Sequence, residues 1–261
     1  MTKILIVEGN SGENIRAIQR SGLPLGSDKY RHALNLYAIN AAIDVSIPYA
    51  PELQAAEIDI TSYDAFALTG SGVKWSSRDP EAKPYLAHIE KILALGKPVI
   101  GSCWGMQTVI QVLGGNCAPN EKGTEIGLAE NIKLSEFGRS HWVFEGMPSC
   151  FSSPCVHRDH VVDLPDTVKL LASNSVSKVQ AISCTQNDVD FVGFQFHPEL
   201  DLDHVKAVQE KLGNIPETHT VISSFPDPVP EIVSDEKLRT KVFGNWLRRV
   251  ENKKAASAEA A

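Results

Sequence analysis

The chain has 261 residues, of which 43% are hydrophobic and 22% are charged, and its formal net charge is −7 at pH 7. This composition is ordinary for a globular protein with a substantial core, and the lack of a stretch dense in Lys and Arg argues against nucleic-acid binding. No apolar stretch approaches the roughly eighteen residues of a membrane span, so we expect a soluble, cytoplasmic protein without a membrane partner.

The cysteine pattern restricts the chemistry further. The sequence has 5 cysteines, an odd number without closely spaced pairs, which indicates a reducing compartment rather than a disulfide framework or a zinc site. The sequence also lacks a Gly-x-x-x-x-Gly-Lys-Ser/Thr loop and any other nucleotide fingerprint. We therefore expect neither a metal nor a cofactor.

In chain order, the N-terminal part alternates short apolar runs with amphipathic segments. Residues 3–7 predict a buried strand, and a polar loop over 8–27 leads into a helix predicted over 28–42. Strands are then predicted over 44–49, over 65–68 and directly before Cys103, with a helix over 81–95 between the last two. This alternation predicts an α/β fold with a doubly wound, mostly parallel sheet.

Beyond residue 114 the pattern changes to short strand-like runs separated by turns. These runs predict an antiparallel extension of the sheet, and they lie at residues 126–134, 168–172, 179–183 and 191–196. Two more helices are predicted, over 203–212 and 235–250, on either side of a proline-rich loop. We expect a single domain over residues 1–250 and a disordered tail over 251–261.

The clearest chemical signal surrounds Cys103. A strand runs into the pattern Gly-x-Cys-x-Gly at residues 101–105, and an apolar helix follows. This is the pattern of a nucleophile elbow, and a cysteine at the N-terminus of a helix has its thiolate favoured by the helix dipole. The alternative is a buried cysteine in a glycine-containing turn, and the pentapeptide alone does not decide between the two.

A cysteine nucleophile needs a base and a group that orients the base. Among the 8 histidines, His197 has the best context, because a predicted strand delivers it to the sheet edge and Pro198 stiffens the turn. Glu199 follows two residues later. Its carboxylate is placed to accept a hydrogen bond from one imidazole nitrogen while the other nitrogen faces Cys103.

Taken together, Gly-Ser-Cys-Trp-Gly-Met-Gln at residues 101–107 and Phe-His-Pro-Glu at 196–199 resemble the class I glutamine amidotransferases, the Cys-His-Glu family. The resemblance extends over residues 3–199 and is strongest to stand-alone members akin to the amidotransferase half of guanosine-monophosphate synthetase. Gly70–Gly72 lies where those proteins have their oxyanion loop, and His-Arg-Asp-His-Val at 157–161 resembles their His-x-Asp-x-Val segment.

The resemblance implies that Cys103 attacks the γ-amide carbon of glutamine or of a γ-glutamyl amide. It implies that His197 acts first as base and then as acid, held by Glu199, and that water finally releases glutamate from a thioester. The backbone N–H groups that it implies for the oxyanion hole belong to Gly70, Ser71 and Trp104.

Substrate contacts follow from the same analogy. Gln107 is expected to contact the glutamyl group, and the backbone around His157, Arg158 and Asp159 to hold its α-amino and α-carboxylate groups. Trp75 or Arg78, after the oxyanion loop, is a candidate for selecting the group on the amide nitrogen; the alternative is that both are solvated loop residues.

Some features depart from the family pattern or leave alternatives open. Ser71 replaces a glycine and Gly72 a proline that are usual in the oxyanion loop, which leaves open whether that loop is preformed. One alternative function is a glutaminase subunit that supplies ammonia to a separate synthase. Two others are a protease or deglycase of the parkinsonism-linked superfamily, which Trp104 disfavours because a histidine commonly follows that cysteine, and a non-catalytic binding module, which the filled triad disfavours.

Overall fold

The computed structural model describes residues 1–261 except 38–40, 55, 187–188, 213–219 and 260–261. Its strands are β1 (Thr2–Val7), β2 (Ala41–Ser46), β3 (Ala65–Leu68), β4 (Pro98–Ser102), β5 (Asn116–Pro119), β6 (Thr124–Leu134), β7 (Cys150–His157), β8 (Asp159–Asp163), β9 (Lys169–Ser173), β10 (Ala181–Cys184), β11 (Asp190–Phe194) and β12 (Val221–Ser224). Its α-helices are α1 (Gly12–Ser21), α2 (Gly26–Asn35), α3 (Lys83–Leu93), α4 (Trp104–Val112), α5 (Glu136–Ser140), α6 (Leu202–Leu212), α7 (Glu231–Ser234), α8 (Glu236–Arg239) and α9 (Lys241–Glu259). Short 3-10 helices lie at Pro51–Leu53, Ile60–Ser62, Pro80–Ala82 and Trp142–Phe144.

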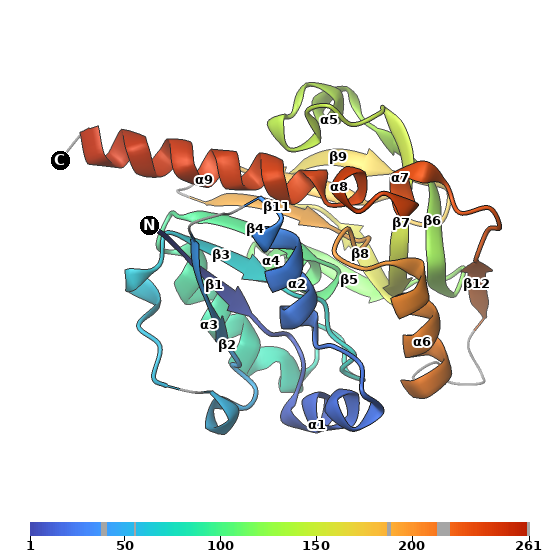
Figure 1. Ribbon diagram of the computed structural model, residues 1–261, viewed down its shortest axis with the longest axis horizontal. Coiled ribbons are helices and arrows are strands. Elements are labelled where there is room, and N and C mark those ends of the chain that lie inside the picture. Colours follow the sequence, from blue (N-terminus) through green and yellow to red (C-terminus); the bar gives the residue numbers. More distant parts are fainter. Residues whose placement is uncertain (38–40, 55, 187–188, 213–219, 260–261) are drawn as a thin grey trace.

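Within the described residues, a mixed sheet of 10 strands has the order β12-β6-β9-β10-β11-β4-β3-β1-β2, with β7 paired to β6 (Figure 1). The segment β11-β4-β3-β1-β2 is parallel throughout. Beyond β11, the pairs β11–β10, β10–β9 and β9–β6 are antiparallel. The predicted α/β fold, a doubly wound, mostly parallel sheet with an antiparallel extension, is confirmed.

Helices cover both faces of the parallel segment, and the alternation along β1 shows how. Ile4 and Ile6 point into a core shared with α2 and α9, whereas Leu5 and Val7 point into a core shared with α3 and α4. Successive residues of a strand face opposite sides, so a strand buried on both faces is apolar at every position. This explains why the run at the start of the chain carries no polar alternation.

The predicted polar loop over 8–27 contains a helix, α1. Only Gly12 and Ile15 of this helix are buried, so its apolar face is narrow and the segment is polar on average. Its start is fixed by a cap instead, because the Ser11 side chain accepts a hydrogen bond from the Asn14 N–H.

Other boundaries also differ from prediction. β2 begins at Ala41 rather than at residue 44, and α2 ends at Asn35, before the predicted end of the helix over 28–42, of which 38–40 lie outside the described residues. The strands β5, β7, β8 and β12 were not predicted. Each is short or mixes polar with apolar residues, so its pairing depends on distant partners that local pattern does not reveal.

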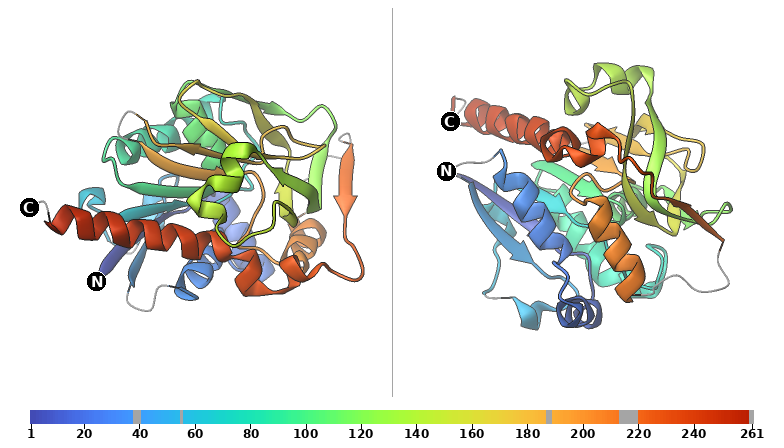
Figure 2. Two further views of the ribbon diagram at one scale, coloured as in Figure 1. Left: turned by 90° about the horizontal axis from the view of Figure 1, so that it is seen from above. Right: turned by 45° about the vertical axis from the view of Figure 1, so that its right-hand side comes forward.

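The C-terminal helix is longer than predicted. α9 reaches Glu259, so most of the range expected to be a disordered tail is helical, while residues 260–261 lie outside the description. Lys254 Nζ donates to the Met1 carbonyl at 2.8 Å, and Lys253 pairs with Asp190 at 2.7 Å. These contacts tie the end of α9 to the edge where β1 begins, and both ends lie on the same side of the molecule (Figure 2). In the described ranges, no helix is long and apolar enough to cross a membrane.

Three partly buried histidines are held neutral by the fold. Burial lowers the pKa of His88, His141 and His204 to about 4, and the nearby charges of Lys91, Arg249 and Lys29 respectively add to the effect. Between pH 6.5 and 4 the unfolded chain therefore binds protons at these sites that the native state does not. These three sites therefore lower the free energy of unfolding as the pH falls through that window.

We predict that exchanging His88 and His141 for glutamine reduces this acid loss of stability. Each site contributes a slope of at most about 1.4 kcal/mol per pH unit. Urea unfolding at pH 7, 5.5 and 4.5 measures the loss in the native chain and in the double variant. His32→Gln is the control, because the His32 side chain is 61% exposed; a double variant with the same acid loss as this control would contradict the prediction.

Candidate active site

Cys103 occupies a strained turn between β4 and α4. Its φ is 47° and its ψ is −106°, and among the described non-glycine residues only Asn131 shares a positive φ. The Cys103 N–H donates to the Phe194 carbonyl at 2.7 Å, and its own carbonyl accepts from the Gln107 N–H at 2.9 Å. Hydrogen bonds to β11 on one side and within α4 on the other thus hold a conformation that the residue alone disfavours.

The turn packs directly on the neighbouring strand. A Cβ on Gly105 would lie 2.6 Å from the carbonyl oxygen of Leu68, at the end of β3. This close approach explains the second glycine of the Gly-x-Cys-x-Gly pattern. The result is a nucleophile elbow, with Cys103 6% exposed at the N-terminal end of α4.

His197 and Glu199 lie beside the elbow as a buried pair. The distance between His197 Nδ1 and Glu199 Oε1 is 2.6 Å, and both residues are 5% exposed. Burial opposes protonation of the imidazole, but the charge of Glu199 and hydrogen bonding to Cys103 and Glu199 outweigh it and raise the pKa of His197 to about 10. With Nδ1 engaged by Glu199, Nε2 is the nitrogen left to face the thiol.

The loop after β3 closes the other side of the imidazole. A Cβ on Gly70 would lie 2.6 Å from His197 Cε1, so the loop backbone and the ring are in direct contact. Ser71 is not among the residues with positive φ. No described residue accepts a hydrogen bond from the backbone N–H of Gly70 or Ser71, and the Trp104 N–H is one of the first donors of α4, which have no partner within the helix.

Two residues that sequence analysis missed support this loop from the end of β1. Asn10 Oδ1 accepts from the Gly72 N–H at 2.8 Å, and Asn10 Nδ2 donates to Glu8 Oε1 at 2.8 Å. Glu8 is completely buried, and its other oxygen accepts from the Ser27 N–H at 2.8 Å. Their position directly after the first predicted strand was a usable signal, since the carboxyl ends of parallel strands share one edge.

Gln107 and the 157–161 segment meet below the elbow. Gln107 Nε2 donates to the Asp159 carbonyl at 2.8 Å, which joins α4 to the start of β8. Cys103 Sγ lies 3.7 Å from the Val156 carbonyl, so the end of β7 passes beside the thiol. The backbone around His157 and Asp159 therefore lies next to the nucleophile, while the Gln107 side chain is tied to that backbone.

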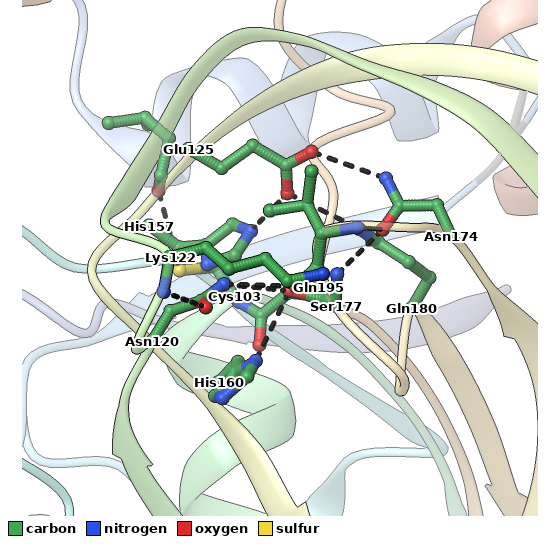
Figure 3. A network of polar contacts seen from close by, with 12 residues as sticks. Cys103, Asn120, Lys122, Glu125, His157, His160, Asn174, Ser177, Gln180 and Gln195 are labelled. Carbon is green, nitrogen blue, oxygen red and sulfur yellow. Dashed lines mark hydrogen bonds and ion pairs between the residues drawn. The ribbon is translucent and has the colours of Figure 1, made fainter. Parts of the chain in front are cut away.

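The His157 side chain belongs to a buried polar network. Its Nε2 lies 2.8 Å from Glu125 Oε2, and Asn174 Nδ2 and Gln180 Nε2 donate to the same carboxylate at 3.2 and 3.4 Å (Figure 3). The imidazole is thus occupied with structural contacts. The imidazole of His157 is therefore held in this network, and it is the backbone at Val156 and His157 that lies beside Cys103.

Arg158 and Trp75 both hold the segment that follows the oxyanion loop. Arg158 Nε donates to Asp159 Oδ1 at 2.7 Å, and its Nη1 donates to the Lys74 carbonyl at 2.9 Å. Trp75 Nε1 donates to the Tyr49 hydroxyl at 3.2 Å, and the two rings pack edge to face. Arg158 therefore links this segment to the 157–161 segment, and the Trp75 indole is turned toward Tyr49.

Comparison with known proteins agrees with this geometry. The model of the family described as glutamine amidotransferase class-I matches residues 28–208, which is more than half of the chain. The chain belongs to the class I glutamine amidotransferases. This membership makes it an amidohydrolase, as the paired motifs predicted.

Similar amidotransferase-family proteins include enzymes named for γ-glutamyl substrates. A γ-glutamyl-L-1-hydroxyisopropylamide hydrolase of a Pseudomonas species is 26% identical, over 76% of this chain and 68% of that protein. Gamma-glutamyl peptidase 4 of Arabidopsis thaliana is 27% identical, over 74% of this chain and 76% of that protein. A GMP synthase of Syntrophomonas wolfei is 32% identical, over 59% of this chain but only 28% of that enzyme. Among solved structures, a glutamine amidotransferase from Thermotoga maritima superimposes with a TM-score of 0.66 at 19% identity, covering 95% of this chain and 97% of that one.

Proposed function

We propose that this amidotransferase-family protein hydrolyses the γ-amide of a γ-glutamyl amide through a thioester on Cys103, releasing glutamate and an amine. The observation that carries the proposal is the strained Cys103 elbow placed beside the buried His197–Glu199 pair. The two relatives named for γ-glutamyl amides and peptides support the substrate class, because this chain covers more than two thirds of each.

In the proposed reaction, an imidazolium on His197 is paired with a thiolate on Cys103. The sulfur attacks the γ-carbonyl carbon, and the resulting oxyanion accepts hydrogen bonds from backbone N–H groups of Trp104 and of Gly70 or Ser71. The C–N bond breaks as His197 gives its proton to the departing amine. Water then attacks the thioester, transfers a proton to His197, and releases glutamate as the thiolate re-forms.

The substrate roles proposed for the surrounding residues follow from where the structure holds them. The backbone of His157, Arg158 and Asp159 is proposed to hold the α-amino and α-carboxylate groups, because this segment runs beside the thiol. Gln107 is proposed to position this backbone for the glutamyl group, because its side-chain amide donates to the Asp159 carbonyl. Trp75 is proposed to influence the amine side through the segment that Arg158 fastens at Lys74.

A second candidate is a glutaminase subunit that supplies ammonia to a separate synthase. The similarity to GMP synthases supports it, since those enzymes match over less than a third of their length. In that case glutamine is the substrate, and turnover depends on a partner.

Glutamate release from a substrate panel tests the proposal. The panel contains glutamine, γ-glutamyl alkylamides and a γ-glutamyl dipeptide, with an α-glutamyl amide as the matched control for the position of the scissile bond. We expect kcat/KM for the preferred γ-glutamyl amide to exceed that for glutamine by about tenfold or more, without turnover of the α-amide. Failure to release glutamate from any γ-amide would contradict the proposal, and activity on glutamine only after addition of a synthase would favour the second candidate.

A further inference from the structure

Behind the triad, on the face of the sheet opposite α4, lies a second layer of polar contacts. Ser102 Oγ donates to Glu199 Oε1 at 2.9 Å, the same oxygen that His197 Nδ1 contacts at 2.6 Å. The Tyr30 hydroxyl donates in turn to Ser102 Oγ at 2.8 Å. Ser102 and Tyr30 are both completely buried.

Strand alternation places Ser102 on that face. Ile100 points into the core that also contains Tyr30, and Ser102, two residues later on β4, points to the same side. Cys103 then turns away at the elbow. The nucleophile and the residue before it therefore approach the His197–Glu199 pair from different sides.

The donors to Glu199 are concentrated on one oxygen. Oε1 receives both His197 and Ser102, whereas Oε2 is buried and has no hydrogen-bond partner among the described residues. A serine hydroxyl has a single proton, which Ser102 gives to Glu199, so its oxygen is free to accept the proton of Tyr30. Two hydrogen bonds thus form a directed chain from Tyr30 through Ser102 to the carboxylate, and His197 contacts the same oxygen from the other side.

We propose that Ser102 and Tyr30 are positioning residues that fix Glu199 behind His197, so that the catalytic triad acts as part of a five-residue chain. The inference rests on the proposed function for its turnover readout. Without the Ser102 hydroxyl, His197 is the one hydrogen-bond donor to the Glu199 carboxylate among the described residues. Tyr30 acts through Ser102, since its hydroxyl contacts Ser102 rather than the triad.

Titratable groups other than the triad lie near Ser102 and Glu199. The pKa of the Tyr30 hydroxyl is raised well above its usual value, by burial and then by the charge of Glu199, so Tyr30 remains a neutral donor. His204 on α6 interacts electrostatically with His197 and Glu199. Asp201 accepts a hydrogen bond from the His204 N–H and lies 2.9 Å from Lys29 on α2. These groups are left unchanged in the variants that test the proposal.

Ser102→Ala is expected to lower kcat/KM for the preferred γ-glutamyl amide by about tenfold, with KM nearly unchanged. Tyr30→Phe should lower kcat/KM by a smaller factor, and the double variant should be no worse than Ser102→Ala alone. Ser183→Ala, which removes another buried serine hydroxyl in β10, is the matched control.

The pH dependence of Cys103 alkylation by iodoacetamide gives a readout that needs no substrate. We expect its midpoint to rise in Ser102→Ala and in Tyr30→Phe but not in Ser183→Ala, because a loosened Glu199 supports the imidazolium that stabilises the thiolate less well. If Ser102→Ala does not fold, Tyr30→Phe decides. Unchanged midpoints would overturn the inference even if γ-glutamyl amides are cleaved, whereas shifted midpoints without cleavage would uphold it and reject the proposed function.

Discussion

Replacing Cys103 with alanine is expected to lower kcat/KM for glutamate release by at least about 10³-fold while the fold is retained. Alanine keeps the Cβ that the turn already accommodates, so the backbone is asked for the same φ as before. It removes the sulfur atom that forms the thioester in the proposed reaction. A coupled glutamate assay measures the loss, and intact-protein mass after an acid quench detects the γ-glutamyl adduct on the native chain alone.

Cys150→Ala is the control for this experiment, because Cys150 is an exposed cysteine on β7. It should retain native turnover and still form the adduct. If Cys103→Ala kept more than about a tenth of the native activity, the nucleophile would have to be another group, and the assignment of the elbow as the reacting centre would fail.

Replacing Gly70 with alanine is expected to lower kcat/KM by about 10²-fold or more. The change disturbs the contact of the loop with the proposed base, His197, and leaves Cys103 in place. The new Cβ would lie 2.6 Å from His197 Cε1, so either the ring or the oxyanion loop must move. The His197 ring cannot rotate freely, because its Nδ1 lies 2.6 Å from Glu199 Oε1. We therefore expect the loop after β3 to move, so that its backbone N–H groups no longer point toward the proposed oxyanion. Steady-state kinetics with the preferred amide measures the effect on turnover.

The control for Gly70 is Gly12→Ala, at the start of α1. There the nearest atom to an added Cβ is 3.1 Å away, so the same chemical change needs only a small adjustment. Its kcat/KM should stay within a few-fold of native, with a similar thermal midpoint. Equal activities of the two variants would show that the contact between loop and imidazole does not matter for the reaction.

Much of the fold could be predicted from the sequence because its central strands are buried on both faces. Runs such as the one in β1 are apolar at every position, and the helices between them carry clear stripes. α1 escaped prediction because its apolar face is narrow, with two buried residues, and its start is marked by the cap at Ser11. β7 was missed because it mixes polar and apolar residues, and it forms by pairing with β6, a long-range contact that local pattern does not encode.

In the site, the contact between His197 and Glu199 followed from their spacing of two residues, and the elbow from its two glycines. The Ser102–Tyr30 layer could not be found in this way. Tyr30 lies on α2, far in sequence from the Cys103 and His197 motifs. Ser102 is one of the two variable positions of the Gly-x-Cys-x-Gly pattern, so the pattern gives it no role. Only the face of β4 on which it lies, fixed by the packing of α2 against the sheet, brings it to the carboxylate.

The hydrogen bond from Cys103 to Phe194 has a consequence for how the site comes into being. The positive φ of the cysteine is enforced by a carbonyl on β11, a strand that follows much later in the chain. Without β11 beside β4, the Cys103 N–H lacks the carbonyl of Phe194 that it binds in the native fold, and this contribution to the strained turn is missing. The same strand leads directly into His197. We therefore expect the strained turn at Cys103 and the position of His197 to form together, when β11 pairs with β4.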